Sequence, residues 1–315
     1  MSARIIVSPL AQVNDRPLAL YAKGGPTGPP VRGRQLRDGR AHDRGISFGS
    51  HQPGFRMIYV CIPSHNEAPT VGLLLWKIRQ VFSAFEREYQ LLVGDDGSTD
   101  ATGEVLQPYT RALPLTVIRS PEQRGYARTV ESLLRVAVER TDRPKRDCAI
   151  VMHADFAHQP HFIPDMVRHI DGGADVVVGE GGAVGEPSRG LRLLRRWAPI
   201  LLRSKVGVPG VSDIVSGFVA FRLITLRNAL RDAPEPMLRT QGWAANAELI
   251  GHAARHARRI ETVPTVERHD LRHRPSRLNP WDTARALWRS RGSLHFAPPV
   301  ERAATSVERE VELVS

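Results

Sequence analysis

Five short apolar runs, each followed by polar or helix-forming sequence, constrain the fold of this chain more than any other feature. The runs are MIYVCIP (57–63), QLLVG (90–94), LTVI (115–118), CAIVM (148–152) and DVVVG (175–179). Runs of this length are typical of strands that are buried on both faces of a parallel sheet. The order predicts an α/β fold, Rossmann-like, with a mostly parallel central sheet and flanking helices in a single domain.

The segment between the first two runs has helical spacing. Apolar residues recur every three or four positions over 69–88, which predicts an amphipathic helix. Asn66 is expected to cap this helix, and Pro69 suits its first turn. A second helix is predicted over 127–140.

The two ends of the chain differ from this pattern. Residues 22–56 are rich in Gly, Pro, Arg and His and lack periodicity, so 1–56 is predicted to be a disordered basic extension. Residues 57–290 are expected to form the folded domain. The polar, Glu-rich segment 291–315 is predicted to be a flexible tail.

The net charge limits the classes of binding partner, and the cysteines indicate the cellular compartment. The formal net charge is +11, which suits nucleic acid, an anionic membrane surface or a phosphate-bearing substrate. No nucleic-acid-binding motif accompanies the charge, so nucleic acid is not expected. No apolar stretch approaches the roughly 20 residues of a membrane-spanning helix, so any membrane contact is expected to be peripheral. Cys61 and Cys148 lie inside apolar runs and are predicted to be buried thiols of a cytoplasmic protein.

Polar motifs follow three of the predicted strands at the point where each ends. They are PSHNE (63–67), DDGSTD (95–100) and HADF (153–156). Because ligands of parallel α/β sheets bind at the carboxyl ends of the strands, we expect these motifs to meet in one site.

Seven blocks in order carry a resemblance to a known family: PSHNEAPTV, LLVGDDGSTDAT, RGYARTV, IVMHADFAHQP, ADVVVG, SDIVSGFVAFR and GWAANAELI. Together they resemble family 2 inverting glycosyltransferases of the GT-A fold, and dolichyl/polyprenyl-phosphate mannose synthases in particular. The resemblance implies transfer of a hexose from GDP-mannose or a UDP-sugar to a polyprenyl phosphate. Two alternatives stay open. One is a soluble transferase acting on a small molecule, and the other is a catalytically impaired homologue that acts as a binding subunit.

The resemblance also implies which residues hold the donor. They lie in the first three blocks and in a closing basic segment, VPTVERHDLRHRPSRL, which resembles the family's loop over the diphosphate. The implied donor-binding residues are Pro63, Ser64, His65, Glu67, Asp95, Asp96, Arg124, Gly125, Arg272 and Arg277.

The HADF block departs from the family's metal motif. Relatives read Asp-Ala-Asp-x-Gln, whereas this chain has His153, Asp155 and Ala157 at the three ligand positions. A pair formed by His153 and Asp155 implies a preference for Mn²⁺ over Mg²⁺, because imidazole suits transition metals better than hard Mg²⁺. The alternative is that arginines neutralise the phosphates instead. His158 is interpreted as a solvated loop residue.

The later blocks imply which residues lie near the acceptor substrate. Asp155 and Asp213 match positions close to the reaction centre, and Glu248 is the candidate general base for a hydroxyl acceptor. The segment 191–205 is both basic and apolar. It is predicted to be a helix, interrupted near Pro199, that suits a membrane interface, with an ordinary packed helix as the alternative.

Overall fold

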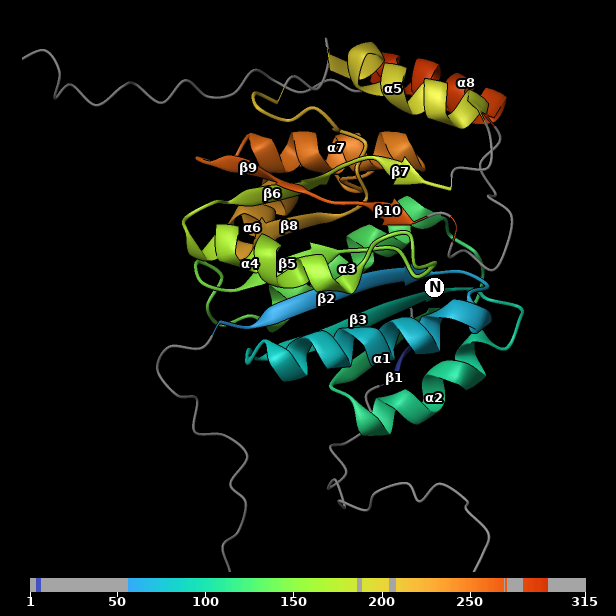
Figure 1. The fold of residues 1–315 in the computed structure, drawn as a ribbon, viewed down its shortest axis with the longest axis vertical. Helices are drawn as coiled ribbons and strands as arrows, with labels where there is room; N and C mark the ends of the chain where they lie inside the picture. The colour runs from blue at the N-terminus through green and yellow to red at the C-terminus, as the bar shows by residue number, and fades with distance from the viewer. Residues whose placement is uncertain are drawn as a thin grey trace, which may run out of the picture.

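A computed structural model describes residues 4–6, 56–185, 189–203, 208–268, 270 and 280–293. Its centre is an eight-stranded sheet in the spatial order β1-β4-β3-β2-β5-β8-β6-β9 (Figure 1). The strands are β1 (Arg4–Ile6), β2 (Ile58–Ser64), β3 (Tyr89–Asp96), β4 (Leu115–Ser120), β5 (Cys148–Val151), β6 (Val176–Glu180), β8 (Val219–Arg222) and β9 (Ile260–Pro264). A separate parallel pair is formed by β7 (Ala183–Val184) and β10 (Glu267–Arg268).

All five predicted strands are confirmed, and the sheet is mostly parallel. Strands β4, β3, β2 and β5 are parallel neighbours, as are β6 and β9. Strand β8 was not predicted as a strand. It lies antiparallel between β5 and β6, and its sequence was identified only as part of the block SDIVSGFVAFR.

Eight α-helices are described around the sheet. They are α1 (Ala68–Ala84), α2 (Thr102–Ala112), α3 (Tyr126–Arg140), α4 (Ile163–Asp171), α5 (Arg189–Arg203), α6 (Leu223–Asp232), α7 (Trp243–Ala254) and α8 (Pro280–Ser293), and a 3₁₀ turn at Pro160–Phe162 leads into α4. The two predicted helices correspond to α1 and α3.

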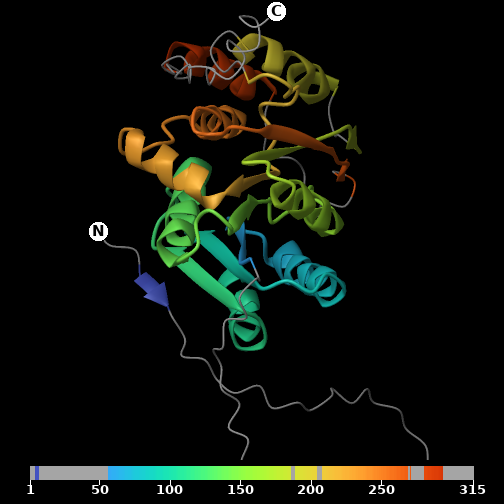
Figure 2. The ribbon, with the colours of Figure 1, turned by 90° about the vertical axis from the view of Figure 1, so that its left-hand side faces the viewer.

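The sheet has a hydrophobic core on each face because side chains alternate along a strand. On β2, Tyr59 and Cys61 pack with α3, α6 and α7, whereas Ile58, Val60 and Ile62 pack with α1, α2 and α4. The views in Figures 1 and 2 show these helices as layers on either side of the sheet.

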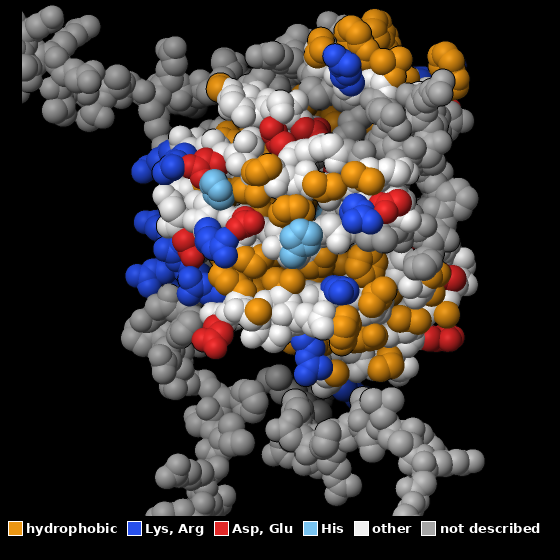
Figure 3. Space-filling model, in the orientation of Figure 1, with side chains coloured by type: hydrophobic (Ala, Val, Ile, Leu, Met, Phe, Trp, Pro, Cys, Tyr) orange, Lys and Arg blue, Asp and Glu red, His pale blue; other side chains and the backbone are white. Residues whose placement is uncertain are grey.

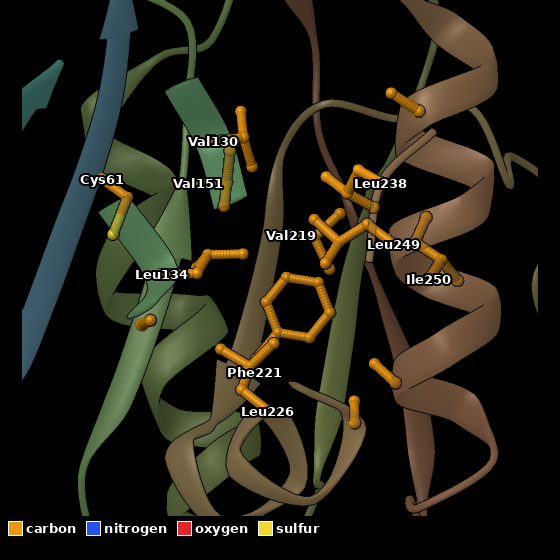
Figure 4. Packing of buried hydrophobic residues seen from close by; sticks show 14 of the residues in the cluster. Cys61, Val130, Leu134, Val151, Val219, Phe221, Leu226, Leu238, Leu249 and Ile250 are labelled. Atoms are coloured by element: carbon orange, nitrogen blue, oxygen red, sulfur yellow. The ribbon is translucent and has the colours of Figure 1, made fainter. Parts of the chain in front are cut away.

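Strand β8 contributes to both cores. Phe221 is fully buried on the face of α3 and α7, and in Figure 4 its ring lies between Leu134 and Ile250. Ala220 belongs to the opposite core. Cys61 and Cys148 are both buried and free, as predicted.

Helices α5 and α8 form an outer pair that packs on the α7 side of the molecule (Figure 2). Ala198, Leu202 and Leu287 anchor the pair in the core. The expected interruption near Pro199 is wrong, since α5 runs unbroken from Arg189 to Arg203. Within the described ranges, none of the helices combines the length and the apolar character needed to cross a bilayer.

The prediction for residues 1–56 is wrong at one place. Arg4–Ile6 form β1, which pairs antiparallel with β4 and extends the sheet by one strand. Helix α8 reaches Ser293, inside the segment assigned to the tail. Residues 7–55 and 294–315 lie outside the described part of the chain.

Candidate active site

A cavity of about 230 Å³ opens at the carboxyl ends of β2, β3 and β5. All three strand-end motifs reach it, as the sequence predicts. It is lined by Pro63, Ser64, His65, Glu67, Asp96, Gln123, Tyr126, Thr129, His153, Ala154 and Asp155.

Hydrogen bonds join the first two motifs into one wall. His65 Nδ1 donates to the carbonyl oxygen of Asp96 at 2.7 Å, and the Asn66 backbone N–H donates to Ser98 Oγ at 2.9 Å. The Asn66 side-chain oxygen accepts from the backbone N–H of Thr99 at 2.8 Å. Asn66 therefore does not cap α1, whose N-cap residue is Glu67. Instead it holds the DDGSTD turn against the end of β2.

The two adjacent aspartates of β3 have different surroundings. The carboxylate of Asp96 lines the cavity and accepts from the backbone N–H groups of Arg124 at 2.7 Å and Gly125 at 2.8 Å. Asp95 is only 1% exposed, outside the cavity lining. Its Oδ1 accepts from the Ser98 N–H, and its Oδ2 lies 3.3 Å from Arg119 Nε. Asp96 thus positions the start of α3, whereas Asp95 stabilises the turn.

Arg124 and Gly125 contribute to this wall through their backbone. Gly125 has φ +93°, which favours glycine, and an added Cβ would lie 3.0 Å from the amide atoms of Gln241. The Arg124 side chain is exposed and lies beside α3, outside the cavity lining. A phosphate contact by Arg124 stays a prediction.

Two further side chains of the first motif point to a ligand. Ser64 Oγ is buried in the cavity wall, and among the described residues it has no hydrogen-bond partner. Such a hydroxyl loses free energy unless a ligand or water pairs with it. Glu67 is also buried, and its Oε2 accepts from Thr70 Oγ1 at 3.1 Å.

The HADF block supplies the far wall of the cavity. Asp155 Oδ1 accepts from the Ala157 N–H at 3.1 Å, and His153 Nε2 lies 3.3 Å from the Tyr126 hydroxyl. Ala157 stands where relatives carry an amide, and its carbonyl accepts from the Arg268 N–H at 2.9 Å. This contact connects the block to β10.

His158 is not the solvated residue that was expected. It is 2% exposed, and its ring stacks on Phe218 with 5.1 Å between centroids. Its Nδ1 accepts from the His153 N–H at 3.1 Å, and its Nε2 lies 3.5 Å from Glu267 Oε1. His158 therefore links the HADF block to β10.

Four residues of the lining were not among the predicted site residues: Gln123, Tyr126, Thr129 and Ala154. Ala154 lies within the HADF block, and the other three belong to the start of α3 or the turn before it. Tyr126 and Thr129 are three positions apart, so they share one face of the helix. That spacing within RGYARTV could have identified Tyr126 and Thr129.

Asp213 lies outside the residues that line the cavity. Its backbone N–H and that of Ser212 both donate to Glu180 Oε1, at 3.0 and 2.6 Å. Its own Oδ1 accepts from the Val215 N–H at 3.3 Å. Glu180 therefore holds the loop before β8, and Asp213 stays a proposal for the acceptor side.

Glu248 occupies a position that disfavours a role as general base. It is buried outside the cavity lining, and its Oε2 accepts from the backbone N–H groups of residues 239 and 240 and from Thr240 Oγ1. Glu131 accepts in the same way from the N–H groups of residues 237 and 238. Two buried carboxylates thus hold four consecutive backbone donors of the segment 237–240, beside the start of α3.

The state of Glu131 fits this structural role. Burial alone would raise its pKa. The hydrogen bonds from residues 237 and 238 and from Arg135 outweigh burial and hold the pKa of Glu131 below its ordinary value. Because the folded-state pKa is depressed, this carboxylate contributes stability that is lost as pH falls through that pKa.

We expect Glu248→Gln to lower the free energy of unfolding by about 2 kcal/mol, since charge-assisted hydrogen bonds to three donors are weakened. The catalytic rate of the folded variant should stay within about threefold of wild type, whereas losing a general base costs about 10²–10⁴-fold. Denaturant unfolding and steady-state kinetics measure the two effects. Glu104→Gln, an exposed residue of α2, is the matched control. A rate loss of a hundredfold without loss of stability would restore the general-base role.

The basic loop predicted to cover the diphosphate is described only in part. Arg272 and Arg277 lie outside the described residues. Arg268, at the start of this segment, pairs with Asp270 through two hydrogen bonds.

Comparison with known proteins places this geometry in a family. Residues 59–228 match the family model for Glycosyl transferase family 2. The chain is 28% identical over 172 residues to a dolichol-phosphate mannosyltransferase of Pyrococcus furiosus, an alignment that spans 52% of this chain and 46% of the relative. It is 26% identical over 212 residues to a polyprenol monophosphomannose synthase of Mycolicibacterium smegmatis, spanning 65% of this chain and 75% of the relative.

A similar fold occurs among solved structures. A mycobacterial protein of known crystal structure superposes with a TM-score of 0.51 at 20% identity, over 77% of this chain and 76% of that chain. With the family match and the sheet order, the fold is of the GT-A type, as the sequence predicts. The first of the two curated relatives is matched over less than half of its own length.

Proposed function

Since this chain belongs to glycosyl transferase family 2, we propose that it transfers a hexose from a nucleotide-sugar to a polyprenyl phosphate, with inversion at the anomeric carbon. One observation carries the proposal: the cavity at the strand ends brings PSHNE, DDGSTD and HADF together. The names of the two relatives support a lipid-phosphate acceptor.

The nucleoside part of the donor would occupy the wall formed by β2 and β3. Ser64 offers an unsatisfied buried hydroxyl there, and Glu67 offers a carboxylate that can accept from a base or a ribose. The His65 ring is held by its bond to Asp96 and presents a face on which a base can stack. Asp96 would act through the α3 turn that it positions and through the cavity wall itself.

The residues of the HADF block fit a divalent cation that is shared with the donor. His153 and Asp155 both line the cavity, and the second nitrogen of His153 is held by the Tyr126 hydroxyl, as metal-bound histidines usually are held. No group of three His, Cys, Asp or Glu side chains suited to a metal occurs in the described part of the chain. The remaining ligands would therefore come from the diphosphate and water, and this mixed donor set favours Mn²⁺ over Mg²⁺.

The chemistry requires that the departing diphosphate be stabilised. When bound, the cation offsets the charge that develops on the diphosphate. His153 and Asp155 would hold it, and the wall around Asp96 would fix the donor so that its anomeric carbon faces the acceptor. A polyprenyl phosphate is already ionised and needs no general base. If the acceptor is a hydroxyl, Asp213 is the remaining candidate to take its proton.

The acceptor side is supported by an exposed apolar surface on α5 and α8. Its five large exposed side chains are Leu193, Trp197, Ile200, Trp281 and Trp288, between 56% and 83% exposed. Arg196, Arg285 and Arg289 are exposed on the same helices. Figure 3 shows hydrophobic side chains gathered over this pair, with basic side chains among them. Aromatic and basic residues together suit the interface of an anionic membrane, so we propose peripheral contact at its cytoplasmic face.

We expect the protein to sediment with vesicles of anionic phospholipid at low salt and to be released as salt rises. Trp197→Asp combined with Trp288→Asp should lower the membrane partition coefficient at least about tenfold. The two new carboxylates are repelled by the anionic lipid, and two aromatic side chains are lost from the interface. Trp76→Asp, at an exposed tryptophan of α1, is the control and should bind more tightly than the double variant. Failure of the wild-type protein to sediment at low salt would favour a small-molecule acceptor.

The proposed reaction is tested by release of nucleoside diphosphate from GDP-mannose and a panel of UDP-sugars, with Mn²⁺ present. Release that requires a polyprenyl phosphate supports the proposal. Release that requires only a small hydroxyl acceptor supports the second candidate, a transferase of small molecules. Absence of release with every donor and acceptor would favour a homologue that binds without catalysis.

A further inference from the structure

A partly buried chain of hydrogen bonds connects α7 to the HADF block. The Tyr126 hydroxyl donates to Asn246 Oδ1 at 2.8 Å and lies 3.3 Å from His153 Nε2. Asn246 Nδ2 donates to the carbonyl oxygen of Val215 at 3.0 Å. Asn246 is 4% exposed and lies 120 positions from Tyr126 in the sequence.

In this chain of hydrogen bonds, each group can donate in only one direction. The bond to the Val215 carbonyl fixes the Asn246 amide, because only its nitrogen can donate. The Asn246 oxygen therefore faces Tyr126 and accepts the single hydroxyl hydrogen of that residue. The Tyr126 oxygen can then only accept from His153, so Nε2 of His153 carries the ring proton. In an imidazole that carries its single proton on Nε2, the lone pair that can bind a metal is on Nδ1.

The packing of the His153 ring also limits its position. The His153 ring is packed against Gly217, where an added Cβ would lie 2.5 Å from Nε2. The absence of a side chain at Gly217 therefore leaves room for the ring beside Tyr126.

We propose that Tyr126 and Asn246 are positioning residues that hold His153 in the Nε2–H tautomer, so that Nδ1 is the nitrogen that binds the divalent cation. The part that concerns the cation rests on the proposed function, whereas the tautomer is a property of the chain without metal. Such partners commonly change metal affinity by about 10–100-fold when they are removed.

The tautomer is measured on the metal-free protein with ¹⁵N-labelled histidine, by long-range ¹H–¹⁵N correlation spectra. The His153→Asn spectrum identifies the His153 signals among the twelve histidines. Wild type should show a protonated Nε2. In Asn246→Leu the Tyr126 proton loses its acceptor and can turn to His153, so protonation should shift toward Nδ1. Asn246→Asp keeps an acceptor oxygen and should retain the Nε2–H form.

Mn²⁺ affinity is measured on the same full-length variants by the electron paramagnetic resonance signal of free Mn²⁺. Tyr126→Phe should weaken Mn²⁺ binding about tenfold, since His153 loses its fixed orientation. Tyr109→Phe, which removes the same atom from α2 outside the cavity, should leave the affinity unchanged.

The outcomes distinguish a failure of this proposal from a failure of the proposed function. A protonated Nδ1 in wild type, or equal Mn²⁺ affinity in wild type and Tyr126→Phe, would overturn it. If the expected tautomer and affinities are found but no sugar is transferred, the positioning role stands and the proposed function fails.

Discussion

Asp155→Asn should lower the rate of sugar transfer about 10³-fold, the largest effect expected of any single substitution in the cavity. Asp155 is the one carboxylate that the HADF block retains from the family's metal motif, and it lines the cavity beside His153. An amide at this position cannot supply the negative charge that holds a cation against the diphosphate. Release of nucleoside diphosphate at saturating donor and Mn²⁺ measures the loss.

Asp165→Asn is the matched control for this substitution. Asp165 is a half-exposed residue of α4 that pairs with Arg168 at the surface, so the rate should be unchanged. Retention of a tenth of wild-type activity in Asp155→Asn would contradict the assigned role. Full wild-type activity in excess chelator would remove the metal from the mechanism and leave the basic segment 268–277 to stabilise the diphosphate.

Asp96→Ala should weaken binding of the nucleoside diphosphate by about 10–100-fold, the loss of about 1.4–2.8 kcal/mol of binding free energy. The carboxylate holds the backbone N–H groups of Arg124 and Gly125, which form the cavity wall at the start of α3. Without the carboxylate, the backbone at the start of α3 is no longer held against the end of β3. The free energy of unfolding should also fall by about 3 kcal/mol, because two charge-assisted hydrogen bonds are removed. Calorimetric titration and denaturant unfolding measure the two quantities.

Asp95→Ala separates affinity from stability at the neighbouring position. Asp95 is buried against Arg119 and the Ser98 N–H, outside the cavity lining, so stability should fall while affinity changes by less than about threefold. Unchanged affinity in both single variants would contradict the donor site at the end of β3.

The five strand runs and the order of the motifs could be predicted from the sequence because both depend on local chemistry. An apolar run of a few residues between turns can be satisfied only by burial on both faces, which is what β2, β3 and β5 show. The strand-end motifs meet at one edge because parallel strands share an orientation. The cavity lining confirms that these motifs converge, since seven of its residues come from the predicted set.

The direction of individual strands and the partners of individual side chains, by contrast, were decided by the tertiary structure. Nothing local in VAFR encodes that β8 runs antiparallel between β5 and β6. Asp95 and Asp96 are adjacent in sequence, and only the pleat of β3 and the approach of α3 send one to Arg119 and the other to the cavity.

The same holds for the buried polar contacts. Glu248 was the candidate general base for a hydroxyl acceptor, yet it accepts from the segment 239–240, because a buried charge is stable only where donors surround it. Tyr126 meets Asn246 across 120 residues. Such pairings depend on how α3 and α7 pack against the sheet, and no pattern of spacing along the chain can express that packing.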